Sequence, residues 1–178
     1  MIKTKGINHI ALVCRDMEET VKFYTEVLHM PLFKTVELPG GGQHFFFDCG
    51  GGNAVAFFWW ADGPPAAPGI ASVKSFPYDA KTAVGSMNHL AFDMEESELE
   101  AALDRLEEAG VEHTHAVINH DDSKMGMTQE MHEGVFVRSV YFTDPNGIML
   151  EFAATTKDFG PDDIAHKPAT AADRVEPA

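Results

Sequence analysis

The 178 residues include 13 Lys and Arg against 28 Asp and Glu, which gives a formal net charge of −15 at pH 7. A chain this acidic repels phosphate groups, so nucleic acids and anionic membrane surfaces are poor partners for it. It has two cysteines, no apolar run long enough to cross a bilayer and no recognisable signal peptide. We therefore expect a cytoplasmic protein in a reducing compartment, without a disulfide framework.

The first sixty residues predict one strand, one helix and three further strands. Asp16 is placed to cap the helix, and Pro31 ends it. Glycine-rich breaks separate the apolar stretches that follow. The predicted elements are strand 6–14, helix 17–29 and strands 32–38, 43–49 and 53–60.

Residues 61–85 are rich in Pro, Ala and Gly and connect this unit to the next one. A connection of this length is often a lid or a binding loop, and Phe76, Pro77 and Tyr78 could reach back over a pocket. The alternative is a linker that crosses the surface.

The second half has the same order of elements as the first. It starts with a strand at Met87 and contains an acidic, Met-rich loop that holds His120 and His132. His120, with His115 and His166, is interpreted as a surface residue. The remaining predictions are helix 98–109, strand 111–118, loop 119–134 and strands 135–143 and 148–154.

An internal repeat explains this similarity. Gly6-Ile-Asn-His-Ile-Ala-Leu-Val13 resembles Ser86-Met-Asn-His-Leu-Ala-Phe-Asp93, and each is followed by a capping-box pattern, Asp16-x-x-Glu19 and Ser97-x-x-Glu100. We predict an α+β fold in which two βαβββ modules pair into an eight-stranded, cup-shaped mixed sheet with the helices outside. The expected boundaries are a first module at 1–60, the linker or lid at 61–85, a second module at 86–155 and a polar tail at 156–178. The tail is a mobile end or an arm on a partner subunit.

The last two strands of the second module form a predicted hairpin. Pro145-Asn146-Gly147 suits a type I turn followed by a left-handed glycine, which makes a three-residue loop. This loop length sets Tyr141 opposite Glu151 on one face of the sheet. A carboxylate on an otherwise apolar strand is costly unless a cation pairs with it.

Two histidines share the face of that carboxylate. His9 and His89 occupy matched positions of the repeat, and the large apolar residues of their strands alternate toward the opposite face. Two imidazoles and one carboxylate that converge in a cup suit a divalent metal, as in non-haem Fe(II) oxygenases. The first module has Ala56 where the second has Glu151, so three positions on the metal would stay open for water, substrate or O2.

The paired modules, the Asn-His-Ile/Leu-Ala strand starts and the Asp-Pro-Asn-Gly-x-x-x-Glu ending resemble the vicinal oxygen chelate superfamily, which includes glyoxalases, bleomycin-resistance proteins and extradiol dioxygenases. The second module is most similar to type I extradiol dioxygenases. The resemblance implies a homodimer with His9, His89 and Glu151 as ligands of a divalent metal. Fe(II) is the expected ion, with Zn, Ni, Co or Mn as alternatives.

The same resemblance implies roles for residues around the metal. His132 and Tyr141 would hydrogen-bond a small-molecule substrate and act in catalysis. Asn53 stands where extradiol enzymes carry another catalytic histidine, and His44 is a nearby substitute. Asn53, Phe47 and Phe58 are the predicted substrate-binding residues, since an aromatic-lined cup favours an apolar or aromatic ligand.

We therefore expect a metal-dependent dioxygenase that acts on a catechol-like or other small oxygen-chelating substrate. Two alternatives remain open: a lyase or isomerase similar to glyoxalase or an epimerase, and a resistance protein that binds a small molecule without turnover.

Overall fold

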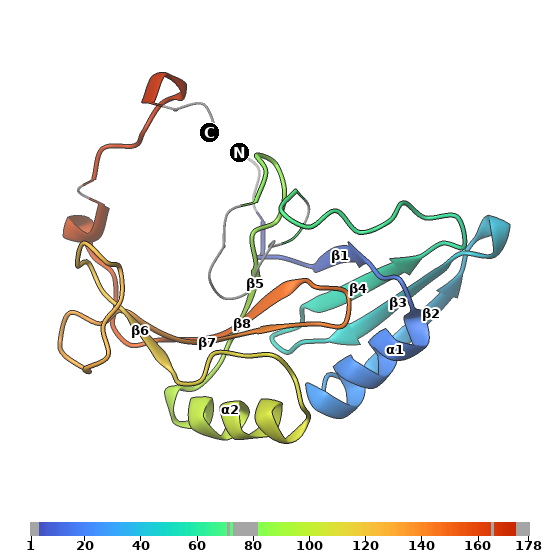
Figure 1. Ribbon diagram of the computed structural model, residues 1–178, viewed down its shortest axis with the longest axis horizontal. Coiled ribbons are helices and arrows are strands. Elements are labelled where there is room, and N and C mark those ends of the chain that lie inside the picture. Colours follow the sequence, from blue (N-terminus) through green and yellow to red (C-terminus); the bar gives the residue numbers. More distant parts are fainter. Residues whose placement is uncertain (1–3, 71, 73–81, 165, 174–178) are drawn as a thin grey trace.

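The computed structural model describes residues 4–70, 72, 82–164 and 166–173. Two βαβββ units follow one another along the chain, as the repeat predicts (Figure 1). The first consists of β1 (His9–Val13), α1 (Met17–Lys22) with a π-helical continuation (Phe23–Val27), β2 (Leu32–Glu37), β3 (Gln43–Asp48) and β4 (Ala54–Trp59). The second consists of β5 (Leu90–Asp93), α2 (Leu99–Glu108), β6 (Ile118–His120), β7 (Val137–Thr143) and β8 (Met149–Thr155).

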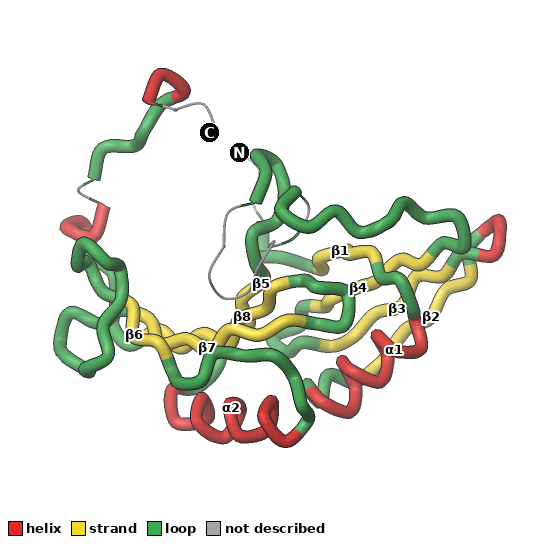
Figure 2. Tube along the Cα trace, viewed as in Figure 1, coloured by secondary structure: helices red, strands yellow, loops and turns green. Residues whose placement is uncertain are grey.

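Each unit forms its own four-stranded mixed sheet. The strand orders are β1-β4-β3-β2 and β5-β8-β7-β6, with the first pair of each sheet parallel and the others antiparallel. The predicted α+β class with two βαβββ modules is confirmed. The eight strands are not hydrogen-bonded into one sheet, because β1 and β5 are edge strands and strand pairing within the described ranges does not join them (Figure 2).

Both helices lie on the same side of the sheets (Figure 1), and we call the other face of each sheet, which no described helix covers, its open face. One hydrophobic core runs through the two modules on the helix side. It includes Tyr24, Phe47 and Phe57 of the first module and Phe142 and Leu150 of the second, all fully buried. Apolar burial of this extent is the main source of stability, and it ties the modules together.

The predicted helix caps differ in outcome. Asp16 caps α1 as expected, since its carboxylate accepts the backbone N–H of Glu19 at 2.9 Å. Ser97 does not cap α2, because it lies inside a 3-10 turn (Glu96–Glu98) and the helix begins one residue after that turn.

The second strand of the second module begins later than predicted. Residues 111–117 are irregular, with one isolated bridge between His113 and Phe142, and β6 begins only at Ile118. Pairing with β7 decides this position, since Ile118 lies opposite Ser139 and His120 lies opposite Val137. His120 is therefore a strand residue.

The β7–β8 hairpin is formed as predicted. Gly147 has a φ of 78°, and Tyr141 lies opposite Glu151 in the register. Asp144 organises the turn, because its carboxylate accepts the backbone N–H groups of Asn146 at 2.8 Å and Ile148 at 2.9 Å.

Polar contacts hold the two modules together beside the core. The backbone N–H of Arg15 donates to Asn146 Oδ1 at 2.9 Å, and Asn146 Nδ2 donates to Thr20 Oγ1 at 3.4 Å. Arg105 of α2 donates to the carbonyl oxygens of Val27 at 2.6 Å and Glu26 at 2.8 Å, where the first helix ends.

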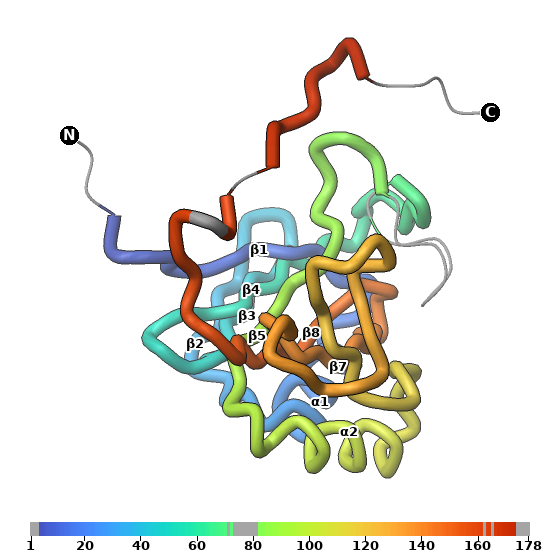
Figure 3. Tube along the Cα trace, turned by 90° about the vertical axis from the view of Figure 1, so that its left-hand side faces the viewer, coloured from blue at the N-terminus to red at the C-terminus, as the bar shows by residue number. Residues whose placement is uncertain are grey.

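Two predicted regions remain without a test. Phe76, Pro77 and Tyr78 of the expected lid lie outside the described residues. The tail carries two 3-10 turns, Pro161–Ile164 and Ala171–Asp173, and extends away from the sheets (Figure 3). None of the helices in the described ranges has the length and apolar character that crossing a bilayer requires.

Replacing Asn146 by Ala removes the side chain that joins the hairpin tip to the start of α1. We expect the free energy of unfolding to fall by about 1 to 2 kcal/mol, because the backbone N–H of Arg15 and the Thr20 hydroxyl lose their partner. Chemical denaturation monitored by circular dichroism measures this. Gln43→Ala is the control, since that amide contacts only exposed Glu37; an equal loss in both variants would contradict the role of Asn146.

Candidate metal centre

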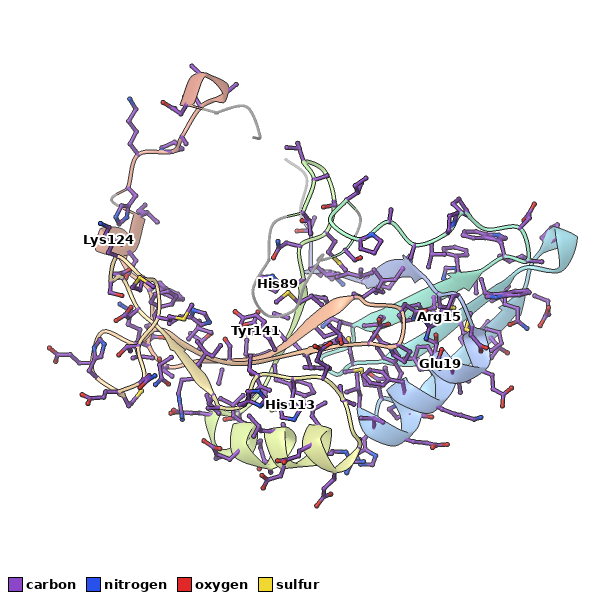
Figure 4. The ribbon with its side chains drawn as sticks, in the orientation of Figure 1. Arg15, Glu19, His89, His113, Lys124 and Tyr141 are labelled. Carbon is purple, nitrogen blue, oxygen red and sulfur yellow. The ribbon has the colours of Figure 1, made fainter. Side chains whose placement is uncertain are left out.

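A buried carboxylate is the centre of the candidate site. Glu151 is only 5% exposed on β8, and its Oε1 accepts a hydrogen bond from Ser139 Oγ of β7 at 2.5 Å. Its other oxygen, Oε2, lies 2.9 Å from Nε2 of His89, which immediately precedes β5. Three neighbouring segments of one sheet thus bring these groups together on the open face, with Tyr141 beside them (Figure 4).

The contact between His89 and Glu151 shifts the pKa of each group toward its charged form. Burial on its own raises the pKa of the Glu151 carboxyl, but hydrogen bonds from His89 and Ser139 outweigh it and hold that pKa below its usual value. The hydrogen bond to Glu151 raises the pKa of His89, although burial acts in the opposite direction. His89 is therefore the partner that the buried carboxylate requires, and its contact with Glu151 favours the protonated imidazole.

Each candidate histidine is oriented by the asparagine before it. Nδ1 of His89 lies 2.8 Å from Oδ1 of Asn88, and Nδ1 of His9 lies 2.8 Å from Oδ1 of Asn8. An acceptor at Nδ1 places a proton there, so Nε2 is the ring nitrogen that would bind a metal. Histidines that bind metals are commonly oriented by such a second hydrogen bond.

His9 lies apart from the other two predicted ligands. It is the first residue of β1 in the first sheet, and its ring meets the edge of Phe46 with centroids 5.6 Å apart. Within the described ranges, no group of three or more His, Cys, Asp and Glu side chains is arranged to hold a metal ion. The structure thus brings His89 and Glu151 together and leaves His9 on the other module.

The two modules differ at the carboxylate position. Ala11 pairs with Ala56 as Ala91 pairs with Glu151, so the register supports the sequence alignment of Ala56 with Glu151. By the same comparison, His44 takes the position of Ser139. His44 is buried, and its Nε2 has no hydrogen-bond partner among the described residues.

Tyr141 has a different histidine partner from the one expected. Its hydroxyl lies 3.0 Å from Nε2 of His120, while Nδ1 of His120 lies 3.2 Å from the carbonyl oxygen of Gly126. Nδ1 therefore carries the proton, and Tyr141 donates to Nε2. Burial and the negative charge of Glu151 raise the pKa of Tyr141, so its hydroxyl keeps its proton at neutral pH.

His132 is held by its own loop. Its Nδ1 accepts the backbone N–H of Gly134 at 3.0 Å, and its Nε2 lies 3.2 Å from Oδ2 of Asp121. Hydrogen bonds from Ser123, and also from His132, lower the pKa of Asp121. His132 thus contacts Asp121, whereas His120 contacts Tyr141.

The three predicted substrate-binding residues fall in different places. Asn53 lines a cavity beside His9, and Phe58 lies on the open face, stacked on Trp60. Phe47 is fully buried in the core, with its ring 5.2 Å from that of Tyr24, so it does not line the open face. Phe46 is the neighbour that points toward His9.

Sequence reasoning missed Ser139, His120, Asn8 and Asn88. Ser139 lies two residues before Tyr141, and this spacing was a usable signal, because strand residues two apart share a face. The Asn-His pair was visible in both repeats. For His120 there was no local signal, since its place depends on the pairing of β6.

The chemistry of the two ligands that the structure brings together suits a divalent metal. One carboxylate oxygen and one imidazole nitrogen meet at 2.9 Å, and both are anchored by other hydrogen bonds. Nitrogen and carboxylate ligands of this kind suit Fe, Zn, Ni, Co and Mn. A metal ion at this position would compensate the charge of Glu151, and His89 would bind it through a deprotonated Nε2.

These features define a protein of two paired βαβββ modules with metal-type ligands on an open sheet face. The model of the Glyoxalase/Bleomycin resistance protein/Dioxygenase superfamily matches residues 6–152 of the chain. The protein therefore belongs to this superfamily. A search of curated protein sequences found no match.

Solved structures share the fold at low sequence identity. A glyoxylase/bleomycin resistance protein/dioxygenase domain from Frankia sp. EAN1pec is 19% identical with a TM-score of 0.63, covering 86% of this chain and 99% of that one. A glyoxalase/dioxygenase from Nostoc punctiforme is 21% identical with a TM-score of 0.60, covering 86% and 92%. The fosfomycin resistance protein FosX from Listeria monocytogenes is 18% identical with a TM-score of 0.56, covering 86% and 96%.

Replacing Glu151 by Gln should lower the pKa of His89 in the metal-free protein. The charged acceptor that raises this pKa is lost, and burial, which lowers it, remains. A pH titration of the imidazole ring signals by NMR measures the change. Asp121→Asn is the matched control, because it acts on His132 and should leave His89 unaltered; an unchanged His89 titration in the Glu151 variant would contradict the pairing.

Proposed function

We propose that the protein is a metal-dependent dioxygenase that acts on a catechol-like or other small oxygen-chelating molecule, with Fe(II) as the metal. His89 and Glu151 are the proposed ligands from the second module, and His9 is the proposed ligand from the first. The observation that carries the proposal is the contact of His89 with buried Glu151, in which both groups are anchored by further hydrogen bonds. His9 has the same Asn-His arrangement as His89.

Three protein ligands would leave room for a chelating substrate and O2. The small side chain of Ala56 supports this choice, because it stands where a second carboxylate would supply a fourth ligand. When bound, Fe(II) supplies the redox chemistry that O2 requires and the positive charge that attracts a hydroxylate.

The residues beside the pair are suited to proton transfer. Tyr141 donates its single hydroxyl proton to Nε2 of His120 in the free protein, and donation to a substrate oxygen would replace this hydrogen bond. His132 stays a candidate only if its loop releases it from Asp121. As the resemblance implies, we propose a homodimer that acts on a small molecule.

Removing the Glu151 carboxylate should abolish metal binding while the fold survives. We expect about one metal ion per chain in protein purified anaerobically and almost none in Glu151→Ala. Without the carboxylate, only the imidazoles of His9 and His89 remain, and two ligands bind a metal weakly. Elemental analysis measures the content, and circular dichroism checks the fold. Metal retention by Glu151→Ala would refute the proposed ligand set.

His9→Ala should lose metal in the same way. The matched control is His115→Ala, which removes an exposed histidine of the second module and should keep its metal. If His9→Ala bound metal as tightly as the control, the ligand from the first module would have to be another residue.

The iron-loaded protein should consume O2 when a catechol is added, in proportion to the catechol lost. An oxygen electrode measures this, and Tyr141→Phe should slow it roughly 100-fold or more through loss of the proton donor. Stoichiometric zinc or nickel with no O2 uptake would instead indicate lyase or isomerase chemistry. Unchanged small-molecule binding after chelation would indicate a binding protein.

A further inference from the structure

A cavity of about 410 Å³ lies beside His9 on the open face of the first sheet. This volume is at the small end of the range for small-molecule sites. Its walls combine aromatic rings, amides and one lysine, in contrast to the acidic character of the whole chain. The lining side chains used below are those of Asn8, His9, Phe33, Lys34, Phe46 and Asn53.

A β-bulge in β2 explains why two successive residues reach this cavity. Leu32 pairs with Phe47 of β3, and Lys34 pairs with Phe46, so Phe33 is the extra residue. In a regular strand, neighbouring side chains point to opposite faces. The bulge breaks this alternation and brings both Phe33 and Lys34 to the side of Phe46.

The aromatic rings of the cavity form a continuous path to His9, the proposed metal ligand of the first module. The rings of Phe33 and Phe46 have centroids 6.1 Å apart, and those of Phe46 and His9 have centroids 5.6 Å apart. Phe33 is 60% exposed, so its ring is accessible to a molecule that enters the cavity. Such a path suits a planar aromatic molecule whose oxygen atoms reach toward His9.

Lys34 gives the cavity a free positive charge. Its ammonium group makes no ion pair with any described residue, although the chain carries 28 acidic residues. Asp48 also borders the cavity, and its Oδ1 accepts the backbone N–H of Gly50 at 2.8 Å, so the acidic group of a ligand is expected beside Lys34 and away from this carboxylate. Because Lys34 is exposed, its ammonium group is accessible to an acidic group of a ligand.

We propose that this cavity binds planar aromatic anions and that Lys34 determines specificity by pairing with a carboxylate of the substrate. Phe33 and Phe46 contact the ring, and the amide of Asn53 borders it. The inference rests on the proposed function, since it assigns the substrate side of the same centre. It narrows the catechol-like class to molecules that carry an acidic group away from the vicinal oxygens.

The test is calorimetric binding, without oxygen, of 3,4-dihydroxybenzoate and of its neutral methyl ester. We expect Lys34→Gln to weaken binding of the acid roughly tenfold, because one charge-assisted hydrogen bond is lost. The affinity for the ester should stay unchanged. Lys34→Arg should retain the affinity for the acid. Lys34 is exposed on an edge strand, so these variants should fold.

The matched control is Lys124→Gln, which removes the same charge at the far end of the second module (Figure 4). It should leave binding of both compounds unaltered. Equal affinity of wild type and Lys34→Gln for the acid, an equal loss for the ester, or no binding of the acid at millimolar concentration would each overturn the proposal.

Repeating the titrations after chelation separates this inference from the proposed function. If metal removal leaves the affinity for the acid unchanged while Lys34→Gln weakens it, the lysine cavity stands and the metal centre is not the substrate site. If metal removal weakens binding while Lys34→Gln does not, the metal site stands and the role of Lys34 is refuted.

Discussion

The register of the β7–β8 hairpin is the constraint on which the site depends. Asp144 holds the backbone N–H groups of Asn146 and Ile148, which sets a three-residue loop, and this loop length puts Tyr141 opposite Glu151. A loop one residue longer or shorter would turn Glu151 toward the core, away from His89. The hairpin tip also contacts the start of α1, so the turn that aligns the site joins the modules as well.

The two modules share one order of strands but carry different side chains at equivalent positions. Equivalent positions carry Ala56 and Glu151, and also His44 and Ser139, while the Asn-His pair is the same in both. The second module therefore holds a carboxylate with its hydrogen-bond donors. The first holds an aromatic face beside His9. This division is consistent with one module that contributes most ligands and another that receives the organic part of a substrate.

Irregular backbone in the edge strands places side chains at the candidate site that a regular repeat would not place there. The bulge in β2 presents Phe33 and Lys34 to one cavity, and the late start of β6 brings His120 to the hydroxyl of Tyr141. In each sheet an edge strand thus supplies side chains to the candidate site. Such departures at strand edges are a common way to aim side chains at a site.

The sequence alone determined the repeat, the α+β class, the Asp16 cap, the hairpin register and the alignment of Ala56 with Glu151. These follow from local rules, namely strand periodicity, loop length and capping. It could not choose between Phe46 and Phe47 within a run of three phenylalanines, because such a run has no alternation. Only the tertiary structure decided that choice, the partners of Glu151 and Tyr141, and the separation of the two sheets, since each depends on pairing between distant segments.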